Sequence, residues 1–237
     1  MELRGRGGGE LRYIGVRHTV NPTDTQIFTI ESEFEGFRPT RVFYEGHDSE
    51  IVAEREPTIR KFGVSGFVRF LAQQSGTPIA SLEPTPEDEM DRLANRFQPE
   101  QLQLFFLLRE VVRLRERHGM SRDEVEQALE DLLTGSELPG IPNPITTMEE
   151  LDRAFWSYWS YPKNWWDASV GWFDPFFSSA DSGGSYTNEL ARESARTRDE
   201  NMVRVLTAAV LEGERVLAVV GRDHIPMQAP ALRCAIE

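Results

Sequence analysis

Residues 215–224 read RVLAVVGRDH, and residues 11–18 read LRYIGVRH. Each stretch runs from a strand-like pattern into a glycine, two further residues and a histidine. The continuous apolar run at 216–220 is typical of a buried central strand in a parallel sheet. One stretch lies near the start of the chain and the other near its end. Together they predict two strands of one α/β sheet that begin and close the fold.

Between these two strands, the first eighty residues alternate strand signals with helix signals. Residues 41–44 and 78–82 predict the second and third strands. A first helix is expected after Asn21, which can cap it, and a second helix is expected over 65–75. This alternation predicts an α/β fold with a mostly parallel central sheet flanked by helices.

The length of 237 residues suits one α/β domain over 1–237. From 85 to 184 the strand signals stop, which predicts a helical and aromatic-rich insertion after the third strand. All five tryptophans lie in its aromatic segment, 155–177. That segment is interpreted either as core of the insertion or as a lid over a pocket, so that the insertion could act as a cap. Residues 1–10, with three consecutive glycines, are expected to form a flexible leader.

Composition narrows the classes of partner. The chain has 39 Asp and Glu against 26 Lys and Arg, a formal charge of −13, so nucleic acid is not expected as a partner. No apolar run approaches the roughly 20 residues of a membrane span, and the start has no secretory pattern, so no membrane partner and a cytoplasmic location are expected. The single cysteine, Cys234, excludes an internal disulfide framework and a cysteine-based metal site. Homo-oligomerisation stays open.

Polar side chains follow four of the predicted strands. His18, Glu45, Glu83 and His224 each come at or shortly after a strand end. Ligands of parallel α/β sheets bind outside the carboxyl ends of the strands, and a glycine there permits close backbone approach. Each residue alone is most simply explained as structural. The four together predict a functional site, whereas His47 and His118 are interpreted as bystanders.

Two chemistries suit this set. His18, His224 and Glu45 could ligate one divalent metal ion that keeps an open position for water. Alternatively, one histidine acts as a general base on water and is oriented by a glutamate.

The helix predicted over 186–212 adds a further polar group. Arg198 and Asp199 lie at the polar end of an apolar helical face that must contact the protein. Arg198 is therefore placed to stabilise an oxyanion or to hold a substrate carboxylate. A structural pairing of Arg198 with Asp199 is the alternative.

These motifs resemble the TraB/PrgY/TIKI group, also called GumN-like, within a superfamily that includes erythromycin esterases and ChaN-type haem-binding proteins. The resemblance rests on the two Gly-x-x-His motifs, the glutamate after the second strand, residues 82–84, and Arg198-Asp199 with Met202. It covers roughly 11–83 and 186–230. It implies an α/β fold with a helical insertion and metal-dependent peptidase activity, with manganese or cobalt favoured.

Carried over by position, the resemblance matches His18 and His224 to the motif histidines, Glu45 and Glu83 to the strand-end acids, and Arg198 to the motif arginine. The first hypothesis is therefore a metal-dependent hydrolase of peptidase or esterase type that acts on an amide or ester bond of a peptide or small molecule. The predicted ligands of a manganese, cobalt or zinc ion are His18, Glu45 and His224, and the predicted catalytic residues are Glu83, Arg198 and Asp199. The alternatives are a non-catalytic protein that binds a small ligand or haem, and a regulatory protein with a vestigial site.

Overall fold

The computed structural model describes residues 1–46, 53–135 and 138–237. The chain divides into two compact units. An α/β unit comprises Met1–Glu83 and Arg198–Glu237, and a helical unit comprises Pro84–Thr197. The insertion expected at 85–184 thus falls within the helical unit, which continues to Thr197. The long helix α8 (Thr187–Leu211) contributes residues to both units.

Within the described residues, the α/β unit contains a five-stranded sheet of order β1-β2-β5-β3-β4. The pairs β2–β5, β5–β3 and β3–β4 are parallel, and only β1 runs antiparallel to its neighbour. The predicted α/β fold with a mostly parallel sheet is therefore confirmed. The strands are β1 Glu2–Arg4, β2 Glu10–Val16, β3 Arg41–Tyr44, β4 Ile79–Ser81 and β5 Arg215–Gly221.

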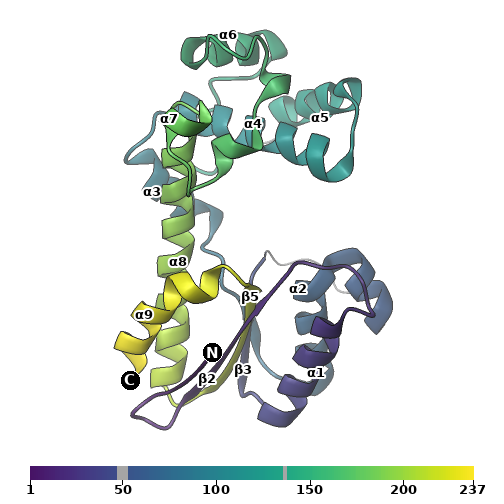
Figure 1. Ribbon diagram of the computed structural model, residues 1–237, viewed down its shortest axis with the longest axis vertical. Helices are drawn as coiled ribbons and strands as arrows, with labels where there is room; N and C mark the ends of the chain where they lie inside the picture. Colours follow the sequence, from purple (N-terminus) through teal and green to yellow (C-terminus); the bar gives the residue numbers. More distant parts are fainter. Residues whose placement is uncertain (47–52, 136–137) are drawn as a thin grey trace. The chain divides into compact units, whose positions relative to one another are not determined.

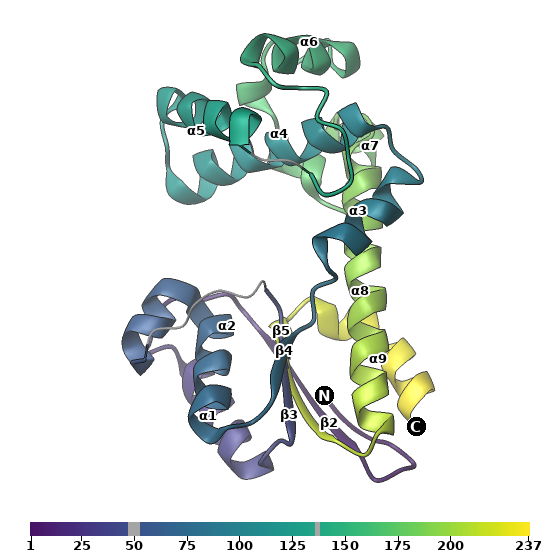
Figure 2. The ribbon, with the colours of Figure 1, turned by 180° about the vertical axis from the view of Figure 1, so that it is seen from behind.

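Helices cover both faces of this sheet (Figure 1, Figure 2). Helices α1 and α2 pack on one face, where Leu217 and Val219 of β5 meet them. Helix α9 and the part of α8 in the α/β unit pack on the other face, against Val216, Ala218 and Val220. Because side chains of a strand alternate between faces, burial on both sides explains the unbroken apolar run of β5. These helices are α1 Thr25–Phe37, α2 Arg55–Ser75 and α9 His224–Ile236.

The N-terminal residues 1–10 form part of the sheet, so the prediction of a flexible leader was wrong. Strand β1 pairs with β2 and buries Leu3. The Gly5 N–H donates to the Gly9 carbonyl at 2.8 Å, and Gly8 takes a positive φ of 88°. Glycine is as much the residue of tight turns as of disordered chain, and here the glycine run closes a hairpin.

Two helix starts also differ from the sequence prediction. Asp24, not Asn21, caps α1, and its carboxylate accepts from the Gln26 N–H at 3.0 Å. Asn21 instead accepts from the Thr23 N–H, which makes it part of a turn. Helix α2 begins ten residues before the predicted 65–75 and is kinked at Gly63, where φ is 64° and ψ is −151°. The kink interrupts the helical periodicity, so the sequence pattern revealed only its second half.

The helical unit has its own core, in which the aromatic segment 155–177 takes part. Trp159 and Trp172 are buried and stack with ring centroids 4.8 Å apart, while Tyr161 and Phe176 are exposed. The core interpretation is thus right for the buried part of the segment. The elements of this unit, besides the start of α8, are α3 Pro86–Ala94, α4 Pro99–His118, α5 Arg122–Gly135, α6 Met148–Tyr158, η1 Trp165–Asp167, η2 Val170–Phe173 and α7 Ser179–Ser182.

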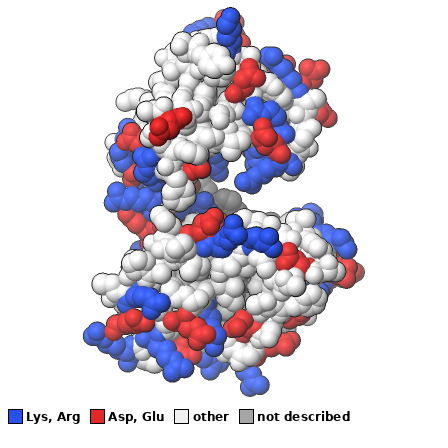
Figure 3. Space-filling model, in the orientation of Figure 1, with Lys and Arg blue, Asp and Glu red and all other residues white. Residues whose placement is uncertain are grey.

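The surface carries charges of both signs. On the face that Figure 3 shows, basic and acidic side chains are interspersed over each unit. Ion pairs account for part of this pattern, as where Arg96 contacts both Glu189 and Glu193. None of the helices in the described ranges combines the length and apolarity needed to cross a membrane.

Candidate functional site

The four strand-end residues all belong to the α/β unit. Glu45 follows β3 directly, His18 and Glu83 come two residues after β2 and β4, and His224 is the first residue of α9. A Cβ atom at Gly221 would lie 3.1 Å from Glu45 Oε2, 3.4 Å from His18 Nε2 and 3.7 Å from His224 Cδ2. The structure therefore brings the three predicted metal ligands together around the Cα of Gly221, at the carboxyl ends of the parallel strands.

The two motif glycines allow this close approach. A Cβ atom at Gly15 would lie 2.7 Å from Ile225 Cγ1 and 2.8 Å from the Cα of Arg222, so no larger residue fits there without a shift. The Arg222 N–H also donates to the Val16 carbonyl at 2.9 Å. The two Gly-x-x-His segments thus pack directly against each other, which holds both histidines at one edge of the sheet.

Glu45 is held at both its backbone and its carboxylate. The Ser65 hydroxyl donates to the Glu45 carbonyl at 2.6 Å. The carboxylate accepts from the Gly221 N–H at 2.5 Å and from Arg198 Nη2 at 3.0 Å. Burial raises the pKa of Glu45, but hydrogen bonds from His224 and Gly221 and the positive charges of His224 and Arg198 outweigh it and lower the pKa to about 2. Glu45 is therefore an anion throughout the neutral range.

Arg198 joins the two strand-end acids. Its Nε and Nη2 donate to the two oxygens of Glu83 at 2.7 and 2.6 Å, and Nη2 also reaches Glu45. The side chain of Glu83 is only 8% exposed and that of Glu45 12% exposed, so their charges need a partner. The guanidinium of Arg198, which was predicted to face a substrate, thus compensates the charges of two buried carboxylates.

His224 is oriented by the neighbouring predicted residue Asp199. The distance from His224 Nδ1 to Asp199 Oδ1 is 2.7 Å, which leaves Nε2 3.5 Å from Glu45 Oε1. Hydrogen bonds to Asp199 and then to Glu45 raise the pKa of His224 to about 9, against the opposing effect of burial. The ring is therefore protonated at neutral pH when nothing else occupies Nε2.

Several residues that position this site escaped the sequence interpretation. Gln228 Nε2 donates to Asp199 Oδ1 at 2.7 Å, and the Tyr13 hydroxyl donates to Gln228 Oε1 at 2.6 Å. Ser81 Oγ accepts from the Glu83 N–H at 3.0 Å, and Asn201 holds the carbonyl before Glu83. Gln228 stands four residues after His224 on α9, so helical spacing was a signal that could have found it.

The donor chemistry suits a divalent metal ion. Two imidazoles and a carboxylate surround one point, and a histidine ligand backed by a carboxylate is a recurring arrangement at metal sites. In the part of the chain that the structure describes, no three His, Cys, Asp or Glu side chains already form a metal-binding group. The Glu45 carboxylate faces the Gly221 N–H and Arg198, and the His224 atom nearest to a Cβ at Gly221 would be the carbon Cδ2. Glu45 would have to give up one of these partners to bind an ion.

The remaining histidines lie apart from this group. His47 is outside the described residues. His118 ends α4 in the helical unit, where its Nε2 lies 2.9 Å from Arg113 Nη1. The interpretation of His118 as a bystander is consistent with that contact.

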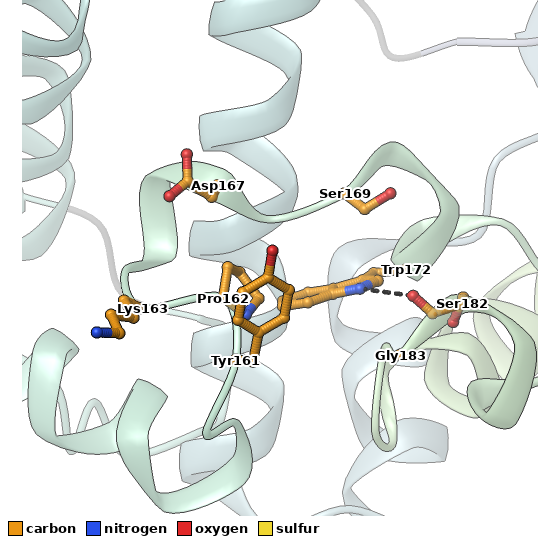
Figure 4. A pocket seen from close by; sticks show the side chains of 8 residues that line it. All are labelled: Tyr161, Pro162, Lys163, Asp167, Ser169, Trp172, Ser182 and Gly183. Atoms are coloured by element: carbon orange, nitrogen blue, oxygen red, sulfur yellow. Dashed lines mark hydrogen bonds between the residues drawn. The ribbon is translucent and has the colours of Figure 1, made fainter.

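A cavity of about 620 Å³ lies in the helical unit along the aromatic segment. Tyr161 stands at the centre of the view in Figure 4, but Lys163, Asp167 and Ser169 point in different directions. The Trp172 indole N–H is already used by the Ser182 carbonyl at 3.0 Å. The polar groups of this cavity therefore do not converge on a common point, in contrast to those around Gly221.

Comparisons of the chain with models of known protein families, with curated proteins and with solved structures found no match. A function is therefore inferred from the site and its motifs.

Proposed function

We propose that this protein is a metal-dependent hydrolase that cleaves an amide or ester bond in a peptide or small-molecule substrate. The observation that carries the proposal is the gathering of His18, Glu45 and His224 around Gly221, with Asp199 behind His224. The resemblance of the same residues to the TraB/PrgY/TIKI motifs supports it.

His18, Glu45 and His224 would hold the ion, for which manganese, cobalt and zinc are the candidates. When bound, the ion would act as a Lewis acid and lower the pKa of water, which supplies a hydroxide nucleophile near neutral pH. Asp199 accepts from His224 Nδ1, so it fixes the ring and leaves Nε2 as the metal-facing atom.

Glu83 and Arg198 complete the site. Glu83 is proposed as the acid/base group, which takes a proton from the attacking water and then passes it to the leaving group. Arg198 balances the negative charges of Glu45 and Glu83 and stabilises negative charge that develops during the reaction. In this scheme Arg198 acts mainly by holding both acids in place.

Metal-free catalysis with a histidine as the general base fits this site less well than the metal-dependent mechanism. A general base must be unprotonated at the working pH. The pKa of His224 is raised to about 9 by Asp199 and Glu45, so the ring is a poor base near pH 7. Occupation of Nε2 by a metal ion removes this difficulty because the ion takes the place of the proton.

Metal analysis of the purified chain by mass spectrometry tests the proposal. About one transition metal ion per chain is expected in the wild type and in the control variant His118→Ala, as one three-ligand site would hold. Little metal is expected in His18→Ala and in His224→Ala. Metal-loaded wild type is then screened against peptides and esters.

Two results would contradict the metal site. One is absence of metal after loading with manganese, cobalt and zinc. The other is full metal content in both histidine variants. A Soret band in the purified protein would instead favour the haem-binding alternative.

A further inference from the structure

A chain of hydrogen-bonded polar groups, the first two of them buried, runs from the sheet to His224. Tyr13 lies on β2, Gln228 on α9 and Asp199 on α8, so three separate elements contribute to it. The side chains of Tyr13 and Gln228 are 1% and 2% exposed. Polar groups buried this deeply are costly unless each finds a partner, so their mutual hydrogen bonds constrain one another.

The direction of each hydrogen bond follows from the chemistry of its atoms. The Asp199 carboxylate accepts, so the Gln228 amide presents its NH₂ group to it, at 2.7 Å. The opposite end of the amide, Oε1, then accepts from the Tyr13 hydroxyl at 2.6 Å. A reversed amide would bring Gln228 Oε1 against the Asp199 oxygen, and two acceptors would face each other.

The same carboxylate oxygen is shared with His224. The Asp199 carboxylate can only accept, and its Oδ1 lies 2.7 Å from His224 Nδ1, closer than the 3.3 Å between Gln228 Nε2 and the same ring atom. Nδ1 therefore carries a hydrogen whenever it meets the carboxylate. The competing contact of Nε2 with Glu45 Oε1 is longer, at 3.5 Å, so in the neutral ring the hydrogen stays on Nδ1 and the lone pair is on Nε2.

From this geometry we infer that Tyr13 and Gln228 are positioning residues that hold Asp199 and thereby fix the Nδ1–H tautomer of His224. Tyr13 sets the orientation of the amide, the amide holds Asp199 Oδ1, and Asp199 selects the tautomer. The inference rests on the proposed function only for the use of the Nε2 lone pair, which would bind the metal ion. The tautomer itself is a property of the metal-free protein.

Long-range ¹H–¹⁵N correlation spectra of the full chain, labelled at histidine and free of metal, measure the tautomer directly. They are recorded at an alkaline pH at which the spectra themselves show that the ring is neutral. The variants are Tyr13→Phe, which removes only the hydroxyl, and Gln228→Met, which keeps the length of the side chain. A His224→Gln variant assigns the signals.

The wild type is expected to show Nδ1–H almost alone. Both variants are expected to raise the share of the Nε2–H form about five- to tenfold, the change that loss of one ordinary hydrogen bond produces. Tyr158→Phe is the matched control, because Tyr158 donates to Glu100 at 3.2 Å in the helical unit. This control should leave the tautomer ratio of His224 unchanged. Circular dichroism checks that every variant is folded.

An unchanged tautomer in both folded variants would overturn the inference. Metal content, measured separately, distinguishes this failure from failure of the proposed function. If the wild type takes up no metal but the tautomer of His224 changes in both variants, the metal site is refuted and the positioning role is supported. If the wild type binds metal but the tautomer of His224 is the same in both variants as in the wild type, the metal site is supported and the positioning role is refuted.

Discussion

Replacement of Arg198 by methionine should destabilise the α/β unit strongly. The substitution keeps much of the apolar stem but removes the guanidinium that serves Glu83 through two hydrogen bonds and Glu45 through one. Both carboxylates lie in the site with little exposure to water. Glu83 would lose its cation, and Glu45 would keep only His224, without either acid gaining solvent, which is the costly way to break an ion pair.

The size of the effect follows from burial. Removal of one partner from a fully buried pair costs about 3–5 kcal/mol. The side chain of Arg198 is 30% exposed, so water screens part of the interaction and about 2–4 kcal/mol is the better expectation. At roughly 2–4 °C per kcal/mol, the unfolding midpoint should fall by about 5–15 °C.

The assay has to report on the correct unit. All five tryptophans lie within 156–172, in the helical unit, whereas Arg198 and both acids belong to the α/β unit. Thermal unfolding is therefore followed by far-ultraviolet circular dichroism together with tryptophan fluorescence. The loss of stability must be seen by circular dichroism, whether or not the fluorescence transition moves with it.

Arg60→Met provides the matched control in the same unit. Arg60 pairs with Glu56 on α2 at 3.6 Å, and both side chains are more than 60% exposed. Such a pair contributes about 0.2–1 kcal/mol at most. Combining Arg198→Met with Glu83→Gln should restore part of the stability, because one uncompensated charge disappears. Equal midpoints for Arg198→Met and Arg60→Met would refute the reasoning.

Three further predictions concern the site and the helical core. Gly221→Ala should reduce metal content at least about tenfold, because it places a methyl group among the three proposed ligands. Gly36→Ala, on an open helix surface, should keep the metal content of the wild type and gain up to about 1 kcal/mol of stability. Equal metal content in the two variants would contradict this prediction. In the metal-free protein, His224 should contribute up to about 3 kcal/mol to the free energy of unfolding, because the folded state binds the imidazole proton more tightly than the unfolded state. This contribution is complete below pH 6.5 and is lost as the pH rises through about 9. Thermal unfolding midpoints measured between about pH 6 and 10 check this prediction. If the midpoint of the His224→Gln variant depended on pH as strongly as that of the wild type, the prediction would be contradicted. Trp172→Ala should cost about 3–5 kcal/mol in denaturant unfolding followed by circular dichroism, since it removes the buried ring stacked on Trp159; a cost below about 1 kcal/mol would contradict that packing.

The sheet and the placement of the strand-end residues were predictable because each depends on a local pattern. The apolar run at 216–220 is typical of a strand buried on both faces, and parallel strands bring their carboxyl ends to one edge of the sheet. Glu45 could therefore be expected beside His224 although they are far apart in sequence. Their contact is at 3.5 Å in the structure.

The partners of each side chain could not be predicted in the same way. Helical spacing shows that Arg198 and Asp199 face the protein, but it does not show which acid or histidine each contacts. Neighbouring residues of a helix point in different directions, so each contacts different partners. Arg198 pairs with Glu83 and Glu45, and Asp199 with His224. Tyr13 looked like an ordinary strand residue, because only the packing of α9 on the sheet brings Gln228 to its hydroxyl.

The charges of the site explain how an arginine and a proposed metal ion can share one group of acids. Three carboxylates stand close together, and without a metal ion Arg198 and the protonated His224 offset two of their charges. An ion that replaced the proton on His224 would therefore enter a site that still carries excess negative charge. Arg198 would then stay with Glu83, while Glu45 turned from the guanidinium to the ion. On this account the arginine holds Glu83 and Glu45 together before the ion arrives, and Glu45 is the residue that would change its partner on metal binding.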